Sequence, residues 1–292
     1  MRYGFIGLGT MGVPIAQHMI NGNFEVQVWN RSPERYSLLD GDGVKPSESV
    51  EELFETCDCI FLMLSTEAAT DQILRRDGSG HSQYFQNRII VNMGTFSSAY
   101  SKGLADSIHS AGGQFVESPV SGSRVPAERG ELVAMLAGEK SIVSQVEPVI
   151  KTACSSTVYC GQVPSALLMK HATNMLLIPM MIGIAEASAF ARCSGLDIDL
   201  FQSILGGGQM SCGLVNAKLP KIIEQDYSSQ SSIQNVFVSA LNSVRSAEHM
   251  QHKAPLTELC CRLLQAGIDS GLAEEDVLAL EKVIGNVESR ND

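Results

Sequence analysis

The amino-acid sequence predicts an α/β protein with an N-terminal doubly wound parallel sheet, followed by a long helix and an all-α region. Three observations support this prediction. A glycine-rich turn separates a strand from a helix near the start, strand and helix patterns then alternate, and only helical periodicity remains beyond about Gly161. Helices between successive strands are typical of a parallel sheet covered on both faces. We therefore expect a sheet domain over 1–162, an interdomain helix over 163–194 and a helical domain over 195–292.

The glycine-rich turn lies between an apolar strand, Tyr3–Ile6, and a predicted helix, Val13–Asn21. It has the pattern GxGxxG and consists of Gly7, Leu8, Gly9, Thr10, Met11 and Gly12. In a Rossmann-type fold the first glycine permits the tight turn and the second lets the backbone approach a pyrophosphate. The third allows the helix to pack closely on the strand, and the helix N-terminus offers N–H groups to the phosphates. This context predicts a dinucleotide site, with a purely structural turn as the alternative.

The residues after the second strand indicate which dinucleotide is expected. The strand Glu25–Trp29 is followed by Asn30, Arg31 and Ser32. An NAD-selective site has Asp or Glu here to accept from the ribose 2′-hydroxyl, whereas an NADP-selective site has Arg and neutral donors. An arginine between two neutral polar residues fits a 2′-phosphate, so we expect NADP(H) as the cofactor. An ordinary polar turn is the alternative.

Four further strands are predicted, and the segments that follow the strands should meet. The strands are 59–64, 88–93, 114–117 and 132–137, and helices are expected at 68–75 and 98–111. In open α/β sheets, ligands bind beyond the carboxyl ends of the strands. We therefore expect the loops at 7–12, 30–32, 63–66, 92–95 and 118–123 to converge on one crevice. On this ground we assign Met63, Leu64 and Ser65 to the cofactor site.

The loop after the strand 114–117 contains Ser118, Pro119, Val120, Ser121, Gly122 and Ser123. Serines and a glycine in a turn can direct backbone N–H groups and hydroxyls toward a carboxylate. Ser121, Gly122 and Ser123 are therefore candidates for holding an anionic substrate. The alternative is a flexible loop without a ligand.

The predicted interdomain helix contains a long apolar segment, which has Lys170 at its head and runs to about Cys193. Lys170 and Asn174 are four residues apart, so both side chains project from one face of the helix. Glu186 is the only charged residue between Met175 and Ala191. A helix that is apolar nearly all round is buried on every side, and a polar pair at its start often has a function. The alternative is a lysine at a helix end whose head group lies in water.

Composition limits the partners that we expect. The formal net charge of −11 disfavours nucleic acid and anionic membranes. The 175–191 run is interrupted by Pro179, Gly183 and Glu186, so we interpret it as a buried helix; a membrane span is the alternative. A helix this apolar also suggests burial against a second subunit, in a homodimer or tetramer.

The cysteines and the first residues suggest a cytoplasmic protein without a metal centre. Eight cysteines show neither a CxxC pair nor a Cys/His zinc spacing, so we expect reduced thiols and no metal site. The chain begins directly in a strand pattern, and no leader peptide is expected.

Taken together, these segments resemble the β-hydroxyacid dehydrogenase family, which includes 3-hydroxyisobutyrate dehydrogenase and the glyoxylate, succinic semialdehyde and tartronate semialdehyde reductases. The matching segments are Phe5–Gly12, Asn92–Thr95, Ser118–Gly122, and Gly161 with Lys170 and Asn174. The resemblance spans essentially the whole chain.

The resemblance implies roles for these residues. Lys170 would donate a proton to the substrate carbonyl, Asn174 would position the substrate, and Ser121, Gly122 and Ser123 would hold its carboxylate. Thr95 would lie near the nicotinamide ribose. The implied activity is NADPH-dependent reduction of a small aldehyde, semialdehyde or 2-oxo acid to the hydroxy acid.

The sequence departs from the family pattern around the expected substrate pocket. Family members usually carry Lys-Asp-Leu in the C-terminal domain, where this chain has Asn242 as the residue we expect to substitute for the lysine near the cofactor. Ser123 also stands where glycine is usual. An imine reductase-like enzyme is therefore an alternative, although such relatives generally replace the lysine. A non-catalytic NADP-binding module is a further alternative, which the presence of Lys170 disfavours.

Overall fold

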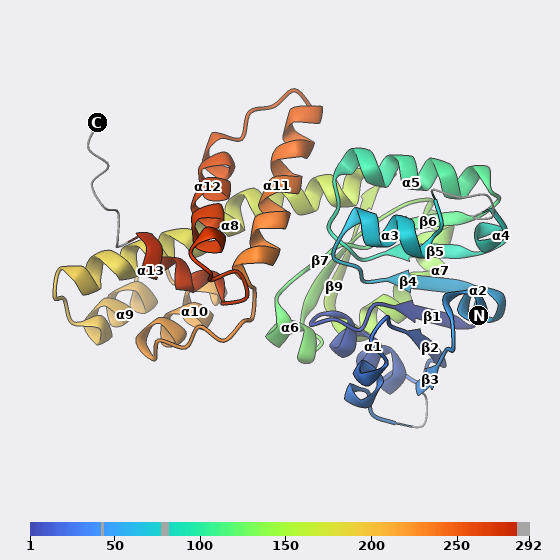
Figure 1. The fold of residues 1–292 in the computed structure, drawn as a ribbon, viewed down its shortest axis with the longest axis horizontal. Coiled ribbons are helices and arrows are strands. Elements are labelled where there is room, and N and C mark those ends of the chain that lie inside the picture. Colours follow the sequence, from blue (N-terminus) through green and yellow to red (C-terminus); the bar gives the residue numbers. More distant parts are fainter. Residues whose placement is uncertain (42–43, 77–81, 285–292) are drawn as a thin grey trace. The chain divides into compact units, whose positions relative to one another are not determined.

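The computed structural model describes residues 1–41, 44–76 and 82–284 and divides into two compact units, Met1–Lys170 and His171–Asp292 (Figure 1). The first unit is an α/β sheet domain, and the second is helical. The helix predicted near 163–194 is α8, Ser165–Cys193, which begins in the first unit and continues in the second. The expected three-part division of the chain stays a prediction.

The sheet of the first unit has nine strands, in the order β3-β2-β1-β4-β5-β6-β8-β7, with β9 pairing with β8. Neighbours from β3 to β6 are parallel, while β8 runs antiparallel to β6 and β7. The strands are β1 Tyr3–Ile6, β2 Val26–Trp29, β3 Val44–Pro46, β4 Cys59–Leu62, β5 Ile89–Asn92, β6 Gln114–Glu117, β7 Val120–Ser121, β8 Leu132–Ala137 and β9 Cys154–Gly161. The strand order reverses between β1 and β4, which is where open α/β sheets bind ligands.

Helices cover both faces of this sheet, and each face has its own core. Alternate strand residues point to opposite faces, so Phe5 and Phe61 belong to one buried cluster while Ile6 and Ile60 belong to the other. The helices are α1 Gly12–Asn21, α2 Val50–Thr56, α3 Glu67–Ile73, α4 Ser82–Phe85, α5 Ser98–Ser110, α6 Arg124–Glu128 and α7 Lys140–Ile150, with 3-10 turns η1 Pro33–Leu38 and η2 Lys151–Ala153. The predicted doubly wound α/β class is confirmed.

The second unit packs helices around one face of α8. Its core includes Ile178, Met181, Ile182 and Ala185 from α8, which cluster with residues of α11, α12 and η3. After α8 come α9 Ile198–Gly207, α10 Gly213–Ile223, α11 Ile233–His249, α12 Pro255–Asp269, η3 Val277–Leu280 and α13 Glu281–Ile284. Within the described ranges, no strand follows Gly161. Ser232 and Asp276 form an isolated β-bridge outside the strands.

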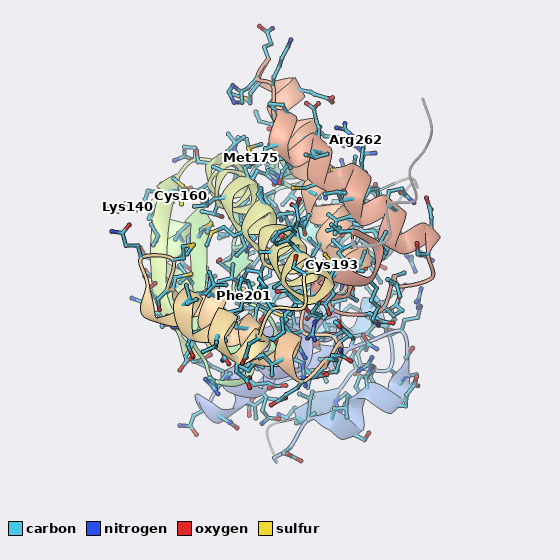
Figure 2. The ribbon with its side chains drawn as sticks, turned by 90° about the vertical axis from the view of Figure 1, so that its left-hand side faces the viewer. Lys140, Cys160, Met175, Cys193, Phe201 and Arg262 are labelled. Carbon is cyan, nitrogen blue, oxygen red and sulfur yellow. The ribbon has the colours of Figure 1, made fainter. Side chains whose placement is uncertain are left out.

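The other face of α8 carries apolar side chains at its surface. Leu176 and Phe190 are 68% and 66% exposed and stand fourteen residues apart, so both lie on one side of the helix. Figure 2 shows α8 and α9, with Cys193 of α8 and Phe201 of α9 labelled. By length and composition alone α8 could also cross a membrane, but half of its most apolar window is buried inside the protein.

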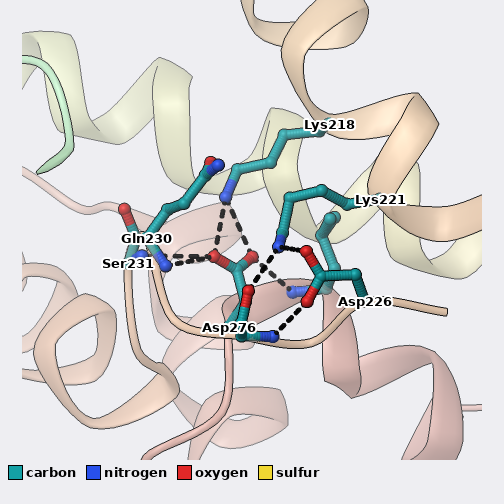
Figure 3. A network of polar contacts seen from close by, with 8 residues as sticks. Lys218, Lys221, Asp226, Gln230, Ser231 and Asp276 are labelled. Carbon is teal, nitrogen blue, oxygen red and sulfur yellow. Dashed lines mark hydrogen bonds and ion pairs between the residues drawn. The ribbon is translucent and has the colours of Figure 1, made fainter. Parts of the chain in front are cut away.

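A buried ion pair holds the loops of the second unit together (Figure 3). Lys218 Nζ lies 2.9 Å from both carboxylate oxygens of Asp276, which has no exposed surface. The same carboxylate accepts hydrogen bonds from the backbone N–H groups of Gln230, Ser231 and Leu278. A buried carboxylate is tolerated only when its oxygens are paired, and these four donors pair both.

Candidate active site

The carboxyl ends of the central parallel strands lie in line. Ile6 pairs in register with Trp29 and with Leu62, Leu62 pairs with Asn92, and Asn92 pairs with Glu117. Backbone hydrogen bonds continue this alignment past the strands, from Met63 N to Ile6 O and from Ser118 N to Asn92 O. The loops that follow β1, β2, β4, β5 and β6 therefore lie side by side at one edge of the sheet; their convergence on one crevice stays a prediction.

The glycine turn is shaped by close backbone contacts. Gly7 has a φ of +103°, and a Cβ added there would lie 2.3 Å from the carbonyl oxygen of Met63. A Cβ on Gly12 would lie 1.8 Å from the carbonyl oxygen of Gly7. A side chain at either position would force the turn to move, because real Cβ atoms do not come this close to the backbone.

Gly9 differs from its neighbours in the turn, because no heavy atom lies within 4 Å of a Cβ built on it. It is exposed, as is Thr10, while Leu8 is buried and Met11 half-buried before the first turn of α1. The absence of a side chain at Gly9 is therefore not required by the packing of the protein. An open glycine at a helix N-terminus fits the close approach of a pyrophosphate.

Asn30 connects the two loops at the dinucleotide end. Its Oδ1 accepts a hydrogen bond of 2.8 Å from Leu8 N, and its Nδ2 donates to the carbonyl oxygen of Ser32 at 3.0 Å. This side chain supports the turn directly, a role that sequence reasoning missed because the partners are 22 residues apart. Arg31 is exposed and Ser32 half-buried. Contacts of these three residues with a 2′-phosphate stay a prediction.

The loops after β4 and β5 lie beside the glycine turn and beside each other. Leu64 lies beside Gly7, and Leu64 O is 2.8 Å from a Cβ built on Gly94. The side chain of Asn92 is fully buried and exchanges hydrogen bonds with the backbone of Gly94, which turns the chain just before Thr95. Met63, Leu64 and Thr95 are half-buried, and Ser65 is exposed. Their contacts with a cofactor stay predictions.

The serine-containing loop after β6 has a defined backbone. Ser121 pairs with Val133 in the short strand β7. Gly122 has a φ of +132°, and a Cβ there would lie 2.6 Å from the side chain of Leu132. Ser123 precedes α6, and both serines are half-buried. The binding of a carboxylate to this loop stays a prediction.

Lys170 lies in the second turn of α8 and is 8% exposed. Burial lowers the pKa of its ammonium group to about 8. The burial of Lys170 disagrees with the alternative that its head group lies in water. A buried lysine with a pKa near neutrality can exchange a proton with a reacting group.

Asn174 follows Lys170 by one turn on the same helix and is 3% exposed. His171, which points to another side of α8, is buried, and its Nδ1 lies 3.1 Å from the hydroxyl oxygen of Ser243. His171 is therefore a packing residue. Asn242 lies in the second unit, where it is buried on α11; its assignment to the cofactor site stays a prediction.

Sequence reasoning missed Glu117, the last residue of β6. Its side chain has no exposed surface and accepts hydrogen bonds from Ser101, Ala166 and Leu167. An acidic residue at the end of an apolar strand, directly before the serine-containing loop, is the signal that could have identified it. In the parts of the chain that the structure describes, no group of three or more His, Cys, Asp or Glu side chains could hold a metal ion.

Comparisons with known proteins agree with this arrangement. Residues 2–161 match the family described as the NAD binding domain of 6-phosphogluconate dehydrogenase. Residues 165–284 match the family described as NAD-binding of NADP-dependent 3-hydroxyisobutyrate dehydrogenase.

Similar proteins cover most of the chain. Glyoxylate/succinic semialdehyde reductase 2, chloroplastic, of Arabidopsis thaliana is 30% identical over 290 residues, which are 98% of this chain and 80% of that protein. Glyoxylate/succinic semialdehyde reductase 1 of the same plant is 32% identical over 227 residues, 78% of each chain. Among solved structures, 3-hydroxyisobutyrate dehydrogenase from Salmonella typhimurium aligns with a TM-score of 0.86 at 20% identity and covers 97% of this chain and 99% of its own.

The glycine turn generates a paired prediction. Gly9→Ala should leave the thermal unfolding midpoint unchanged, because its Cβ meets no atom of the protein, yet it should weaken NADPH binding about tenfold or more by blocking the pyrophosphate. Gly12→Ala should weaken binding and also lower the midpoint. Fluorescence titration and thermal unfolding measure the two quantities. Unchanged NADPH binding by Gly9→Ala would refute the proposed phosphate approach.

Proposed function

The chain belongs to the β-hydroxyacid dehydrogenase family, and we propose that it is an NADPH-dependent reductase of a small aldehyde, semialdehyde or 2-oxo acid. The observation that carries this proposal is the buried Lys170, with Asn174 one turn later, in a chain whose first unit has the dinucleotide-binding turn. The two similar plant reductases are named for glyoxylate and succinic semialdehyde, which are short carbonyl compounds that bear a carboxylate.

Each candidate residue has a chemical task in this reaction. When bound, the reduced nicotinamide supplies the hydride. Negative charge then develops on the carbonyl oxygen of the substrate, and the ammonium of Lys170 stabilises that charge and donates the proton. Asn174 orients the substrate by hydrogen bonding. The loop Ser121–Ser123 holds the substrate carboxylate through hydroxyl and backbone N–H groups.

The preference for NADPH over NADH is supported by the residues after β2. Arg31 is exposed on the loop that Asn30 holds against the glycine turn, and no acidic residue stands at 30–32 to repel a phosphate. A guanidinium group pairs strongly with phosphate oxygens. The 2′-phosphate of NADPH is the group that we expect Arg31 to bind.

We also propose that the exposed apolar side of the second unit packs against a second copy of the chain. Leu176 and Phe190 on α8, and Leu200 and Ile204 on α9, are each more than 60% exposed. Isolated exposed apolar residues are normal, whereas several large ones exposed on α8 and α9 favour an interaction surface. A homodimer, or a tetramer built from dimers, would cover them.

Of three predictions that follow from the proposed function, the first concerns the acid role of Lys170. Reduction requires the protonated ammonium, whose pKa is about 8, so kcat for reduction should be level below this pH and fall as the pH rises through it. Lys170→Ala should lower kcat by about 10²- to 10⁴-fold and remove this pH dependence. Steady-state kinetics with NADPH and, in separate assays, glyoxylate, succinic semialdehyde or a cyclic imine measure kcat and its pH dependence.

The controls separate chemistry from binding. Lys140→Ala changes an exposed lysine of the same unit and should keep wild-type kcat. Lys170→Ala should retain the wild-type dissociation constant for NADPH. Full carbonyl turnover by Lys170→Ala, or wild-type turnover of the imine alone, would contradict the proposal.

The second prediction concerns cofactor choice. Arg31→Ala should raise KM for NADPH by about 10- to 100-fold, since a charge-assisted contact is lost, and should leave KM for NADH nearly unchanged. Lys45→Ala, which removes another exposed cation near the sheet edge, should alter neither value. Equal changes for both cofactors in Arg31→Ala would argue against a 2′-phosphate contact.

The third prediction concerns assembly. Light scattering coupled to size-exclusion chromatography should give the wild-type protein twice or four times the monomer mass of 31.4 kDa. Phe190→Asp should shift the mass toward that of the monomer, because a buried unpaired charge is costly. Leu38→Asp, at an exposed leucine of the first unit, should leave the mass unchanged. A monomeric wild-type protein would exclude this interface.

A further inference from the structure

Glu117 is a buried carboxylate that joins three elements of the first unit. It ends β6, has no exposed surface, and its Oε1 accepts a hydrogen bond of 2.5 Å from the Ser101 hydroxyl on α5. Its Oε2 accepts hydrogen bonds from the backbone N–H groups of Ala166 at 3.1 Å and Leu167 at 3.2 Å. Burial raises the pKa of this carboxyl to about 7, although all three hydrogen bonds favour its ionised form.

These bonds complete the N-terminus of α8. The first N–H groups of a helix have no partner within the helix, and a buried helix end needs an acceptor from elsewhere. Ala166 and Leu167 are the second and third residues of α8, and their acceptor comes from a strand 49 residues earlier. A carboxylate is well placed here because it also faces the positive end of the helix dipole.

The same carboxylate lies between two parts of the candidate active site. Lys170 follows Ala166 by four residues. Its side chain therefore projects from the same face of α8 as that of Ala166, one turn farther along the helix. In the other direction, Ser118 follows Glu117 directly and leads into Ser121 and Gly122. The first turn of α8, which precedes Lys170, and the start of the serine-containing loop are therefore both attached to Glu117.

We propose that Glu117 is a positioning residue of the reductase, which holds α8 so that the Lys170 ammonium keeps a set place relative to the loop Ser121–Ser123. This inference rests on the proposed function of Lys170. The position of the Glu117 carboxylate oxygens determines this role, because two backbone N–H groups need an acceptor there. Its charge is secondary, because an amide oxygen at the same place can accept the same two bonds.

Two substitutions separate the effect of the position of the acceptor oxygen from the effect of the negative charge. Glu117→Gln keeps the acceptor in position and removes the charge, so kcat should stay within about threefold of the wild-type value. Glu117→Asp keeps the charge but withdraws the oxygen by one methylene, and kcat should fall by about 10- to 100-fold. The dissociation constant of NADPH should stay unchanged in both. Ser101→Ala is the matched control, since it removes the third hydrogen bond but leaves both bonds to α8, and it should retain kcat.

A purely structural role is distinguished by two measurements. The isotope effect does not depend on the folded fraction, and in the second measurement a loss of folded protein would lower kcat equally with and without Lys170. With NADPH deuterated at the transferred position, the isotope effect on kcat should rise in Glu117→Asp, because a misplaced acid slows the chemical step. In a Lys170→Ala background, Glu117→Asp should cause no further loss of kcat, because it acts through the lysine.

The outcomes also separate this inference from the proposed function. If Lys170→Ala keeps full turnover, the proposed function fails, and the role of Glu117 fails with it. If Lys170→Ala is impaired but Glu117→Asp keeps wild-type kcat, only the positioning role is overturned. A loss in Glu117→Gln equal to that in Glu117→Asp would likewise overturn it, as would equal losses with and without Lys170.

Discussion

The hydrogen bonds from α8 to the Glu117 carboxylate are the contact on which the candidate active site depends. They attach the start of a 29-residue helix to the end of a central strand. Without an acceptor at this place, two N–H groups at a buried helix end would be unpaired, at a cost comparable to lost hydrogen bonds. The strand that supplies the acceptor continues into the serine-containing loop, so the placements of helix and loop are not independent.

The dinucleotide end of the first unit is built mainly from backbone atoms. Gly7 and Gly12 are required by close contacts within the turn, whereas Gly9 is open toward its surroundings. Asn30 supports the turn through its amide oxygen, and the parallel register brings the neighbouring loops to the same edge. The fold itself tolerates much change in side chains, since a solved structure that is 20% identical aligns with a TM-score of 0.86.

The chemistry assigned to Lys170 follows from its burial. An exposed lysine is fully protonated at neutral pH and holds its proton too firmly to act as an efficient acid, whereas removal from water lowers the pKa to about 8. In the reaction that we propose, the alkoxide that develops on the substrate is the group to which this lysine donates its proton. We expect the departures from the family pattern, Asn242 and Ser123 among them, to affect the choice of substrate more than the type of reaction.

The sequence by itself determined the features that depend on neighbours along the chain. Apolar runs ending in glycine or polar residues located β1, β4 and β5, the GxGxxG spacing located the turn, and helical periodicity located α8. It missed β9, whose Ser155, Ser156 and Val158 are exposed and show no alternation of apolar and polar residues. Only the tertiary structure decided that Glu117 accepts from Ala166 and that Asn30 accepts from Leu8. These partners are far apart in sequence, and which polar groups need an acceptor is settled only when packing has excluded water from them.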